Sequence, residues 1–359
     1  MSENRTHTLC LRGVPVAISQ PWVMGILNAT PDSFFSQSRC INIMEMEVRA
    51  RQIVDEGARI IDVGACSTRP GSTPVSAEDE MLRLDLALEV VKDICPEVYV
   101  SVDTFRASVA RHCVERWGVD IINDIGGGNL DEEMFATVAQ LGVPYVLTHS
   151  RGTPATMQGM TQYANVADEV LQDLTAKAAA LRQLGATQII LDPGFGFGKT
   201  TEQNFALMTR LADFARTGMP VLVGVSRKSM ICNALGVTPD KALHGTTALH
   251  MYALTQGATF LRAHDVAAAA QAITIHSRLN PDPNPNPNPD YIESLELRFL
   301  TLNPKKLNTE IKHVRNNRHH RHTHCGNAAV LCLSQPPRQR NNEHLRGHHR
   351  IPARLGDYV

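Results

Sequence analysis

The stretch Met24-Gly25-Ile26-Leu27-Asn28-Ala29-Thr30-Pro31-Asp32-Ser33-Phe34 decides how the chain is expected to fold. Its short apolar run is typical of a buried strand, and the run ends abruptly in a polar loop. The side chains of that loop, with the pattern Asn-x-Thr-Pro-Asp-Ser, suit an oxyanion or a hydrated metal ion. The segment therefore predicts a strand that presents polar groups at its carboxyl end.

The same arrangement recurs along the chain with a different polar ending each time. Seven further apolar runs are Ile60–Gly64, Val98–Asp103, Ile121–Asp124, Pro144–His149, Ile189–Asp192, Val221–Gly224 and Phe260–His264. The stretches between them space their apolar residues as amphipathic helices do. This alternation predicts an α/β fold, a closed parallel (β/α)8 (TIM) barrel followed by a disordered C-terminal tail. An open, doubly wound sheet alternates its elements in the same way and is the alternative fold.

In a parallel barrel the carboxyl end of every strand faces one shared mouth. Polar residues stand at those ends in nearly every run. The residues expected to converge are Asn28, Asp62, Asp103, Asn123, His149, Asp192, Arg262 and His264. Side chains that are far apart in the sequence would then form one site.

The chain is longer than one barrel requires. It has 359 residues, 43% of them hydrophobic, whereas a barrel of this type takes about 250 residues. Residues 1–280 hold 23 Lys+Arg and 29 Asp+Glu, a balance of −6, and residues 281–359 hold 12 and 7, a balance of +5. The predicted organisation is an N-terminal extension (1–19), the barrel (20–280), an Asn/Pro-repeat linker (281–290) and a basic, His-rich tail (291–359).

The linker and the tail lack the patterns of a folded domain. Alternate prolines in Pro281–Asp290 forbid helix and favour extended backbone. Eight of the fifteen histidines lie in the last 79 residues, where periodic apolar positions are few, so the tail is expected to be disordered. The run His319–Cys325 has no fixed ligand spacing for zinc. One hypothesis is that expansion of the repeat shifted the reading frame; an interaction role for the tail is the alternative.

Composition argues against several classes of protein. The eight cysteines form no Cys-x-x-Cys pair and no apolar N-terminal segment resembles a secretion signal, so the cytoplasm is the expected location. Apolar runs have at most the length of a strand, far below the roughly 20 residues that span a bilayer. Neither a membrane nor a nucleic acid is an expected partner.

The stretch Asp192-Pro193-Gly194-Phe195-Gly196-Phe197-Gly198-Lys199-Thr200 invites comparison with nucleotide-binding loops. The phosphate-binding pattern G-x-x-x-x-G-K-[ST] needs glycine at 193, where proline stands, and the dinucleotide pattern needs glycine at 199, where lysine stands. We therefore interpret the stretch as a strand that ends in a carboxylate, followed by a flexible loop. The two phenylalanines of that loop are expected to stack against a flat heterocycle.

Cations and acceptors are expected on different parts of the mouth. Ser226–Ser229 and Arg262–Asp265 follow the last two strands, where barrels frequently bind phosphate, and together they carry four cations, which indicates an anion. Asp103, Asn123 and Asp192 end other strands. Their oxygens suit a ring with amino and lactam groups, such as a pterin or guanine.

These motifs together resemble the dihydropteroate synthase family, which joins p-aminobenzoate to 6-hydroxymethyl-7,8-dihydropterin diphosphate. The resemblance covers about residues 20–279. The matching stretches are Met24–Phe34, part of Asp62–Gly71, Ser101–Thr104, Ile121–Ile125, His149 with Gly152–Gln158, Asp192–Lys199, Ser226–Met230 and Arg262–Val266. The resemblance implies a homodimeric transferase of folate biosynthesis, inhibited by sulfonamides.

The resemblance also implies a role for each matching residue. The pterin ring would be held by Asp103, Asn123, Asp192 and Lys228. The diphosphate would be held by Asn28, Arg262 and His264, with Asn28 also a ligand of the cofactor Mg²⁺. Thr68 and Arg69 would lie on a mobile loop that closes over the substrate, and p-aminobenzoate would be flanked by Phe197, Lys228 and Ser229. The implied catalytic residues are Asp103, Lys228, Arg262 and His264.

Two loops depart from the family pattern. Phe35-Ser36-Gln37-Ser38 stands where Ser-Asp-Gly-Gly is common, and Ala65-Cys66 stands where Gly-Glu is usual, so each loop loses an acidic residue. An alternative function is therefore a catalytically weak pterin-binding homologue with an interaction role. A corrinoid-dependent methyltransferase is less favoured, because that reaction has no diphosphate to match the cations.

Overall fold

The computed structural model describes residues 6–29, 39–66, 75–153 and 156–281, which belong to a compact unit spanning Met1–Pro285. The predictions for Ser36, Thr68, Arg69, the linker beyond 281 and the tail concern residues outside the described part. Among the described helices, none combines the length and the apolar character that a membrane span requires.

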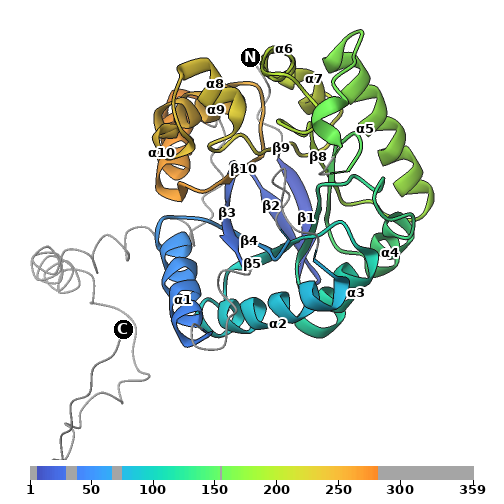
Figure 1. The fold of residues 1–359 in the computed structure, drawn as a ribbon, viewed down its shortest axis with the longest axis vertical. Helices are drawn as coiled ribbons and strands as arrows, with labels where there is room; N and C mark the ends of the chain where they lie inside the picture. Colours follow the sequence, from blue (N-terminus) through green and yellow to red (C-terminus); the bar gives the residue numbers. More distant parts are fainter. Residues whose placement is uncertain (1–5, 30–38, 67–74, 154–155, 282–359) are drawn as a thin grey trace, which may run out of the picture. The chain divides into compact units, whose positions relative to one another are not determined.

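Eight parallel strands form a ring with helices around it (Figure 1). They are β3 (Trp22–Asn28), β4 (Ile60–Gly64), β5 (Tyr99–Asp103), β6 (Ile121–Asp124), β7 (Tyr145–Thr148), β8 (Ile189–Asp192), β9 (Leu222–Val223) and β10 (Phe260–Ala263). They pair in the order β8-β7-β6-β5-β4-β3-β10-β9, and a parallel bridge between Leu191 and Val221 joins the two edges. The predicted (β/α)8 barrel is confirmed, and the doubly wound sheet is excluded.

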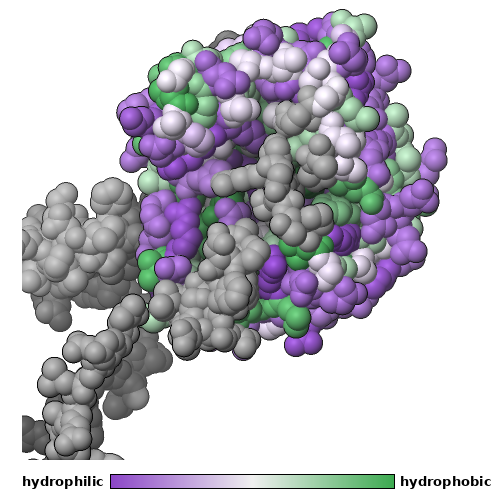
Figure 2. Space-filling view, in the orientation of Figure 1, coloured by the Kyte–Doolittle hydropathy of each residue, from purple (hydrophilic) through white to green (hydrophobic). Residues whose placement is uncertain are grey.

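The helices follow the strands in turn. They are α1 (Arg39–Asp55), α2 (Ala77–Ile94), α3 (Ala107–Trp117), α4 (Met134–Leu141), α5 (Val166–Gln183), α6 (Thr201–Thr209), α7 (Leu211–Ala215), α8 (Ser229–Leu235), α9 (Leu243–Thr255) and α10 (Val266–Leu279). Local chemistry sets several of their ends. A reciprocal capping box between Thr200 and Gln203 begins α6, and α3 ends at Gly118, whose left-handed backbone favours glycine. On the face drawn in Figure 2, the described surface is mainly hydrophilic, with scattered hydrophobic residues.

The apolar residues form two cores, one between the strands and the helices and one inside the ring. The inner core takes one residue from each of seven strands, namely Met24, Ile60, Ile121, Val146, Ile190, Leu222 and Phe260, with Tyr99 packed against it. Such a layer fills the interior of a small barrel, so the ring is solid below its mouth.

A hairpin from the N-terminal extension completes the inner core. It consists of β1 (His7–Leu11) and β2 (Val14–Ile18), which pair antiparallel. Leu9, Leu11 and Ile18 are at most 2% exposed and belong to the same cluster as the inner layer. Residues 7–18 therefore close the end of the barrel opposite the mouth, a contribution that was not predicted from the sequence.

Candidate active site at the barrel mouth

Arg262 lies at the centre of the mouth between two carboxylates. From β10, its Nε donates to Asp62 Oδ2 on β4 and its Nη2 donates to Asp103 Oδ2 on β5, both at 2.7 Å. Asp62 Oδ2 also accepts from Asn123 Nδ2 on β6 at 3.1 Å. Four strand ends thus meet in one network, as the predicted convergence requires.

Burial dominates the electrostatics of this network. It raises the pKa of Asp103 to about 7; the Arg262 charge opposes that shift and the Asp62 charge adds to it. Burial also works against the charge on Arg262, but the two carboxylates more than compensate and raise the pKa of Arg262 above its ordinary value. Asp62 Oδ1 is buried and accepts no hydrogen bond from the described residues. The network therefore leaves one carboxylate oxygen, Asp62 Oδ1, able to accept a hydrogen bond from a ligand.

Asp192 and Lys228 form the neighbouring part of the mouth. Asp192 ends β8, is 6% exposed and accepts from the Gly194 N–H at 2.8 Å. The Lys228 Nζ donates to the Phe195 carbonyl and lies 4.6 Å from the centroid of the Phe197 ring. Burial lowers the pKa of Lys228 to about 8, although Asp192 opposes this, and burial raises the pKa of Asp192, which Lys228 opposes.

The two phenylalanines of the 192–200 loop have different surroundings. Phe195 is 0% exposed and belongs to the outer core, so the prediction that it stacks on a heterocycle is wrong. Phe197 is half-buried beside Lys228. Gly196 between them has φ +83°, and a Cβ there would lie 3.2 Å from the Lys228 side chain. The loop conformation thus depends on glycine at this position.

Lys199 holds this loop from beneath, a role that sequence reasoning missed. It is 5% exposed, and its Nζ donates to the carbonyls of Gly194 at 2.9 Å and Phe197 at 3.1 Å. It also lies 3.0 Å from His149 Nδ1. Burial lowers the pKa of Lys199 to about 7, with Asp192 opposing. His149 was expected at the shared mouth; it is 2% exposed and contacts this lysine instead.

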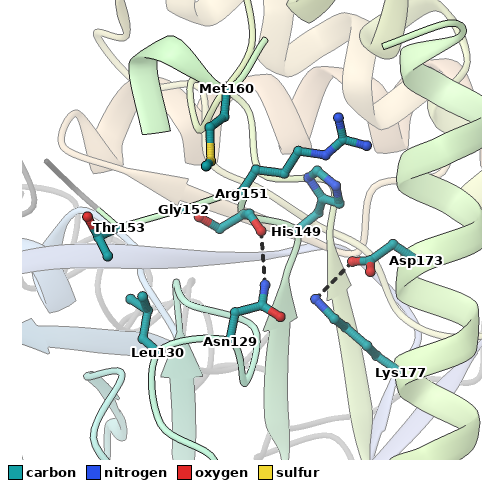
Figure 3. A pocket seen from close by; sticks show the side chains of 10 residues that line it. Asn129, Leu130, His149, Arg151, Gly152, Thr153, Met160, Asp173 and Lys177 are labelled. Carbon is teal, nitrogen blue, oxygen red and sulfur yellow. Dashed lines mark hydrogen bonds and ion pairs between the residues drawn. The ribbon is translucent and has the colours of Figure 1, made fainter. Parts of the chain in front are cut away.

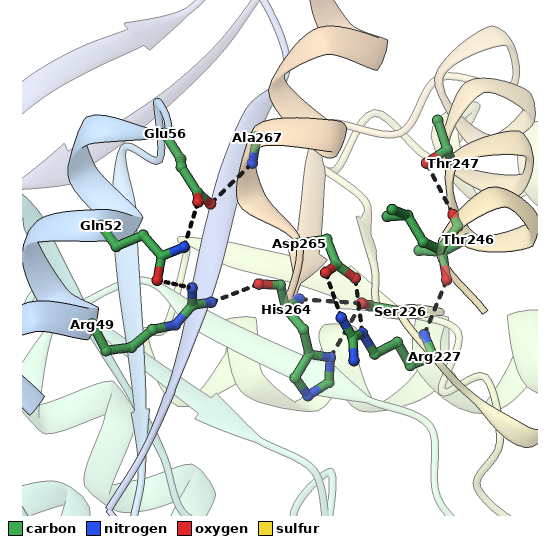
Figure 4. Close-up of polar contacts among 11 residues, drawn as sticks. Arg49, Gln52, Glu56, Ser226, Arg227, Thr246, Thr247, His264, Asp265 and Ala267 are labelled. Carbon is green, nitrogen blue, oxygen red and sulfur yellow. Dashed lines mark hydrogen bonds and ion pairs between the residues drawn. The ribbon is translucent and has the colours of Figure 1, made fainter. Parts of the chain in front are cut away.

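The loops after β9 and β10 are joined by an ion pair (Figure 4). Arg227 donates to both Asp265 oxygens, from Nε at 2.9 Å and from Nη2 at 2.6 Å. Ser226 Oγ lies 3.1 Å from the backbone nitrogen of His264 and 3.1 Å from its Nδ1. From α1, Arg49 Nη2 donates to the His264 carbonyl at 2.6 Å. Three contacts from two residues, Ser226 and Arg49, therefore hold His264 in place.

The four cations predicted to face an anion do not form a free positive cluster. Arg227 is paired with Asp265 and Arg262 with Asp62 and Asp103. Burial, together with the charges of the two arginines, lowers the pKa of His264 to about 4, so its imidazole is neutral at pH 7. Lys228 has Asp192 as an electrostatic neighbour. The prediction is wrong for Arg227, which already has a carboxylate partner.

The remaining predicted residues lie on the rim. Asn28 ends β3 and Ser229 begins α8, and both are exposed. Cys66 follows β4 and is half-buried; burial raises the pKa of its thiol, which therefore carries no charge at neutral pH. The described residues include no group of three or more His, Cys, Asp and Glu that could hold a metal ion. Asn28 offers one amide oxygen, which fits a Mg²⁺ ion bound mainly by substrate phosphates and water.

A (β/α)8 barrel whose mouth joins buried acids, an amide and cations from separate strands defines a barrel enzyme for a flat, polar ligand. The model of the pterin-binding enzyme family matches residues 24–264. The dihydropteroate synthase of Escherichia coli is 40% identical over 270 residues, which are 74% of this chain and 94% of that protein. That of Synechocystis is 40% identical over 261 residues, or 72% and 90%.

Solved structures agree. Dihydropteroate synthase from Thermus thermophilus in complex with 4-aminobenzoate has a TM-score of 0.68 and 40% identity, and the match covers 76% of this chain and 100% of that one. The synthase from Xanthomonas albilineans in complex with 7,8-dihydropteroate has a TM-score of 0.68 and 32% identity, with 77% and 100% covered. The chain therefore belongs to the pterin-binding enzyme family and, within it, to the dihydropteroate synthases.

Proposed function

We propose that the chain condenses 6-hydroxymethyl-7,8-dihydropterin diphosphate with p-aminobenzoate, releasing 7,8-dihydropteroate and diphosphate. The identity to curated synthases along almost their whole length carries this proposal. In the reaction, the arylamine nitrogen attacks the exocyclic methylene carbon of the pterin, and the bond from that carbon to the diphosphate oxygen breaks. No side chain needs to act as a nucleophile.

The pterin ring is proposed to lie over Asp103, Asn123, Asp192 and Lys228. Buried carboxylates suit the ring's N–H donors, because a planar pair of oxygens can accept from two neighbouring nitrogens. Asp103 lies in the charged network with Arg262. An ionised Asp103 beside the ring would stabilise the positive charge that spreads into the dihydropterin as the diphosphate departs.

The diphosphate is proposed to lie over Asn28, Arg262 and His264. Mg²⁺, when bound through Asn28 and the diphosphate, would neutralise charge on the leaving oxygens. The imidazole of His264 is neutral without an anion, so an arriving diphosphate would raise its pKa and favour a charged hydrogen bond. Thr68 and Arg69, outside the described residues, are proposed to close over the substrate.

p-Aminobenzoate is proposed to lie between Phe197, Lys228 and Ser229. Lys228 is fixed over the Phe197 ring, so an aromatic face and a cation are available side by side. The synthase of Yersinia pestis was solved with a sulfonamide drug. We therefore expect a sulfonamide to compete with p-aminobenzoate for this position.

A weak pterin-binding homologue is the second candidate. The observation that favours it is Cys66, an uncharged thiol where the family usually has a glutamate. Such a protein would bind the dihydropterin but release diphosphate slowly. Restoring the acid with Cys66→Glu should then raise turnover, whereas it should lower turnover or leave it unchanged in a fully active synthase.

The deciding experiment measures diphosphate release when p-aminobenzoate is added to the dihydropterin diphosphate with Mg²⁺. Release that depends on all three components supports the proposal, and its absence contradicts it. Lys228→Ala should abolish turnover, while the matched control Lys241→Ala, an exposed lysine on the short helix Pro239–Lys241, should not change it. A chain truncated after Asn280 should retain full turnover, since every residue given a role above lies between Asn28 and His264.

We further propose a cytoplasmic homodimer. Sedimentation of the full chain tests this assembly. A mass of twice 39.4 kDa supports the dimer, and a concentration-independent mass of one chain rejects it.

A further inference from the structure

A second hollow opens beside the mouth, between the loops after β6 and β7 and helix α5 (Figure 3). It has a volume of about 430 Å³, the size of a small-molecule pocket. Its walls include Leu130, His149, Arg151, Met160, Asp173 and Lys177. None of the residues proposed above to hold the pterin, the diphosphate or p-aminobenzoate is among them.

His149 supplies an unused hydrogen-bond donor to this hollow. A charged Lys199 directs its three protons to two carbonyls and His149 Nδ1, so in that state Nδ1 carries no proton and the neutral imidazole holds its proton on Nε2. Within the described part of the chain, Nε2 has no hydrogen-bond partner. His149 is 2% exposed and lines the pocket, so its side chain is fixed in the wall by the surrounding packing.

Positive charge surrounds that donor. Besides burial, the charges of Lys199, Lys177 and Arg151 lower the pKa of His149, so the potential at the ring is positive. Arg151 is held by Glu169 at 2.8 Å and by the Gln162 carbonyl at 2.6 Å, and its guanidinium lies over the Tyr163 ring. Among the described residues, Lys177 has one ion-pair partner, Asp173 on the same helix, whose Oδ2 lies 2.9 Å from Lys177 Nζ. Lys177 is therefore the cation that can turn to a ligand.

We propose that this pocket binds a small organic carboxylate. His149 and Lys177 both line the pocket, so an imidazole N–H and an ammonium group are available to the oxygens of one monoanion, whereas the Asp173 carboxylate in the same wall disfavours a dianion such as phosphate. The volume exceeds that of an inorganic ion, and Leu130 and Met160 offer apolar contact to the rest of the molecule. The proposal goes beyond the proposed reaction, since the pocket shares no side chain with the substrate positions.

The test uses benzoate and its uncharged isostere benzamide in calorimetric titrations of the full chain. Saturating 7,8-dihydropteroate is present, so that benzoate cannot occupy the p-aminobenzoate position. Benzoate should bind at least tenfold more tightly than benzamide. Lys177→Gln should weaken benzoate binding about tenfold, whereas Lys177→Arg should keep it within about twofold.

Asp173→Asn gives the sharper comparison, because it breaks the same ion pair as Lys177→Gln. If the variants acted only by lowering local stability, both would change benzoate affinity in the same direction. The proposal requires opposite directions, with Asp173→Asn tightening benzoate severalfold as the repelling carboxylate disappears. Equal binding of benzamide, no binding to the wild type, or changes of the same sign in the two variants would overturn it. If dihydropteroate itself fails to bind, the proposed reaction is in doubt, and the opposite effects of Lys177→Gln and Asp173→Asn on benzoate affinity then decide whether benzoate binds in this pocket.

Discussion

The two ends of the barrel differ in what they bury, although the same eight strands form both: the mouth buries charged groups and the closed end buries apolar side chains. At the mouth, charged groups are buried together, and Asp62 retains an oxygen without a partner among the described residues. At the other end, the inner layer is apolar and the hairpin β1–β2 covers it. Buried charges cost free energy of desolvation, while buried apolar side chains contribute stability. The comparison teaches that the mouth is arranged for a ligand and the closed end for folding.

Aromatic packing strengthens the closed end. The rings of Trp22 and Tyr99 stack at 5.8 Å between centroids, and Trp22 meets Phe260 edge to face at 6.3 Å. Arg12 of the hairpin lies 5.2 Å above the Tyr99 ring. The first residues of the strands and the hairpin thus pack as one unit. We expect mutations there to lower the free energy of unfolding without changing kcat.

The largest effect is expected from Arg262→Met at the mouth. The change removes the cation shared by Asp62 and Asp103 and the proposed diphosphate contact, so turnover should fall about 10³-fold, equivalent to ~4 kcal/mol. Steady-state diphosphate release measures it, with Lys241→Ala as the control. Turnover within tenfold of the wild type would remove Arg262 from the catalytic group.

The next effect is expected at the closed end. Leu11→Ala deletes a side chain that is 1% exposed, so the free energy of unfolding should fall by about 3 kcal/mol while kcat at low temperature stays unchanged. Denaturant unfolding measures the loss. Val14→Ala in the same hairpin is the matched control, because Val14 is 58% exposed. A large loss of kcat in Leu11→Ala would break the division between the two ends.

A third effect is the pH dependence that Asp103 gives to stability. Its pKa is raised to about 7 in the folded chain, so the folded state binds this proton more tightly than the unfolded state. The resulting stability is fully present below about pH 4, and on the order of 3 kcal/mol of it is lost as the pH rises to about 7. Asp103→Asn should flatten the wild-type curve in that window. An unchanged slope would mean that Arg262 keeps Asp103 ionised throughout.

The smallest effect is expected from Arg12→Met. Arg12 contacts the Val98 carbonyl, the Tyr99 ring and Asp120, at 3.4 Å from the carboxylate, but its side chain is 36% exposed. Solvent screening limits such a pair, so the free energy of unfolding should fall by about 1 kcal/mol and kcat should not change. A loss as large as that of Leu11→Ala would show that the hairpin depends on polar contacts more than on its apolar face.

The strands could be predicted because each is an apolar run that ends in a turn. The hairpin could not be predicted as easily, because it turns at Arg12 and Gly13, with φ of 53° and 74°, and Arg-Gly is not a common sequence for a turn of two positive φ angles. In the sequence His7-Thr8-Leu9-Cys10-Leu11, the two leucines alternate with less apolar residues, and this period of two could have predicted the strand.

The strand-end residues of the site could also be predicted, because a parallel barrel brings all such ends to one mouth. Asp62, Asp103, Asn123 and Arg262 meet as expected. The contacts of Lys199 and the pairing of Arg227 with Asp265 depend on how loops fold over one another. Neither has a spacing rule in the sequence, so both required the structure.

The join between β8 and β9 has one further consequence. β3 and β4 pair over five residues, whereas β9 has two residues and meets β8 through the Leu191–Val221 bridge. Local opening costs least where few hydrogen bonds break. Asp192 is the last residue of β8, and Lys228 lies in the loop after β9. A heterocycle held by both residues would therefore connect the two sides of this seam. A ligand that binds only the closed ring would then make local opening between β8 and β9 rarer, and a ring that opens more readily would bind the ligand more weakly.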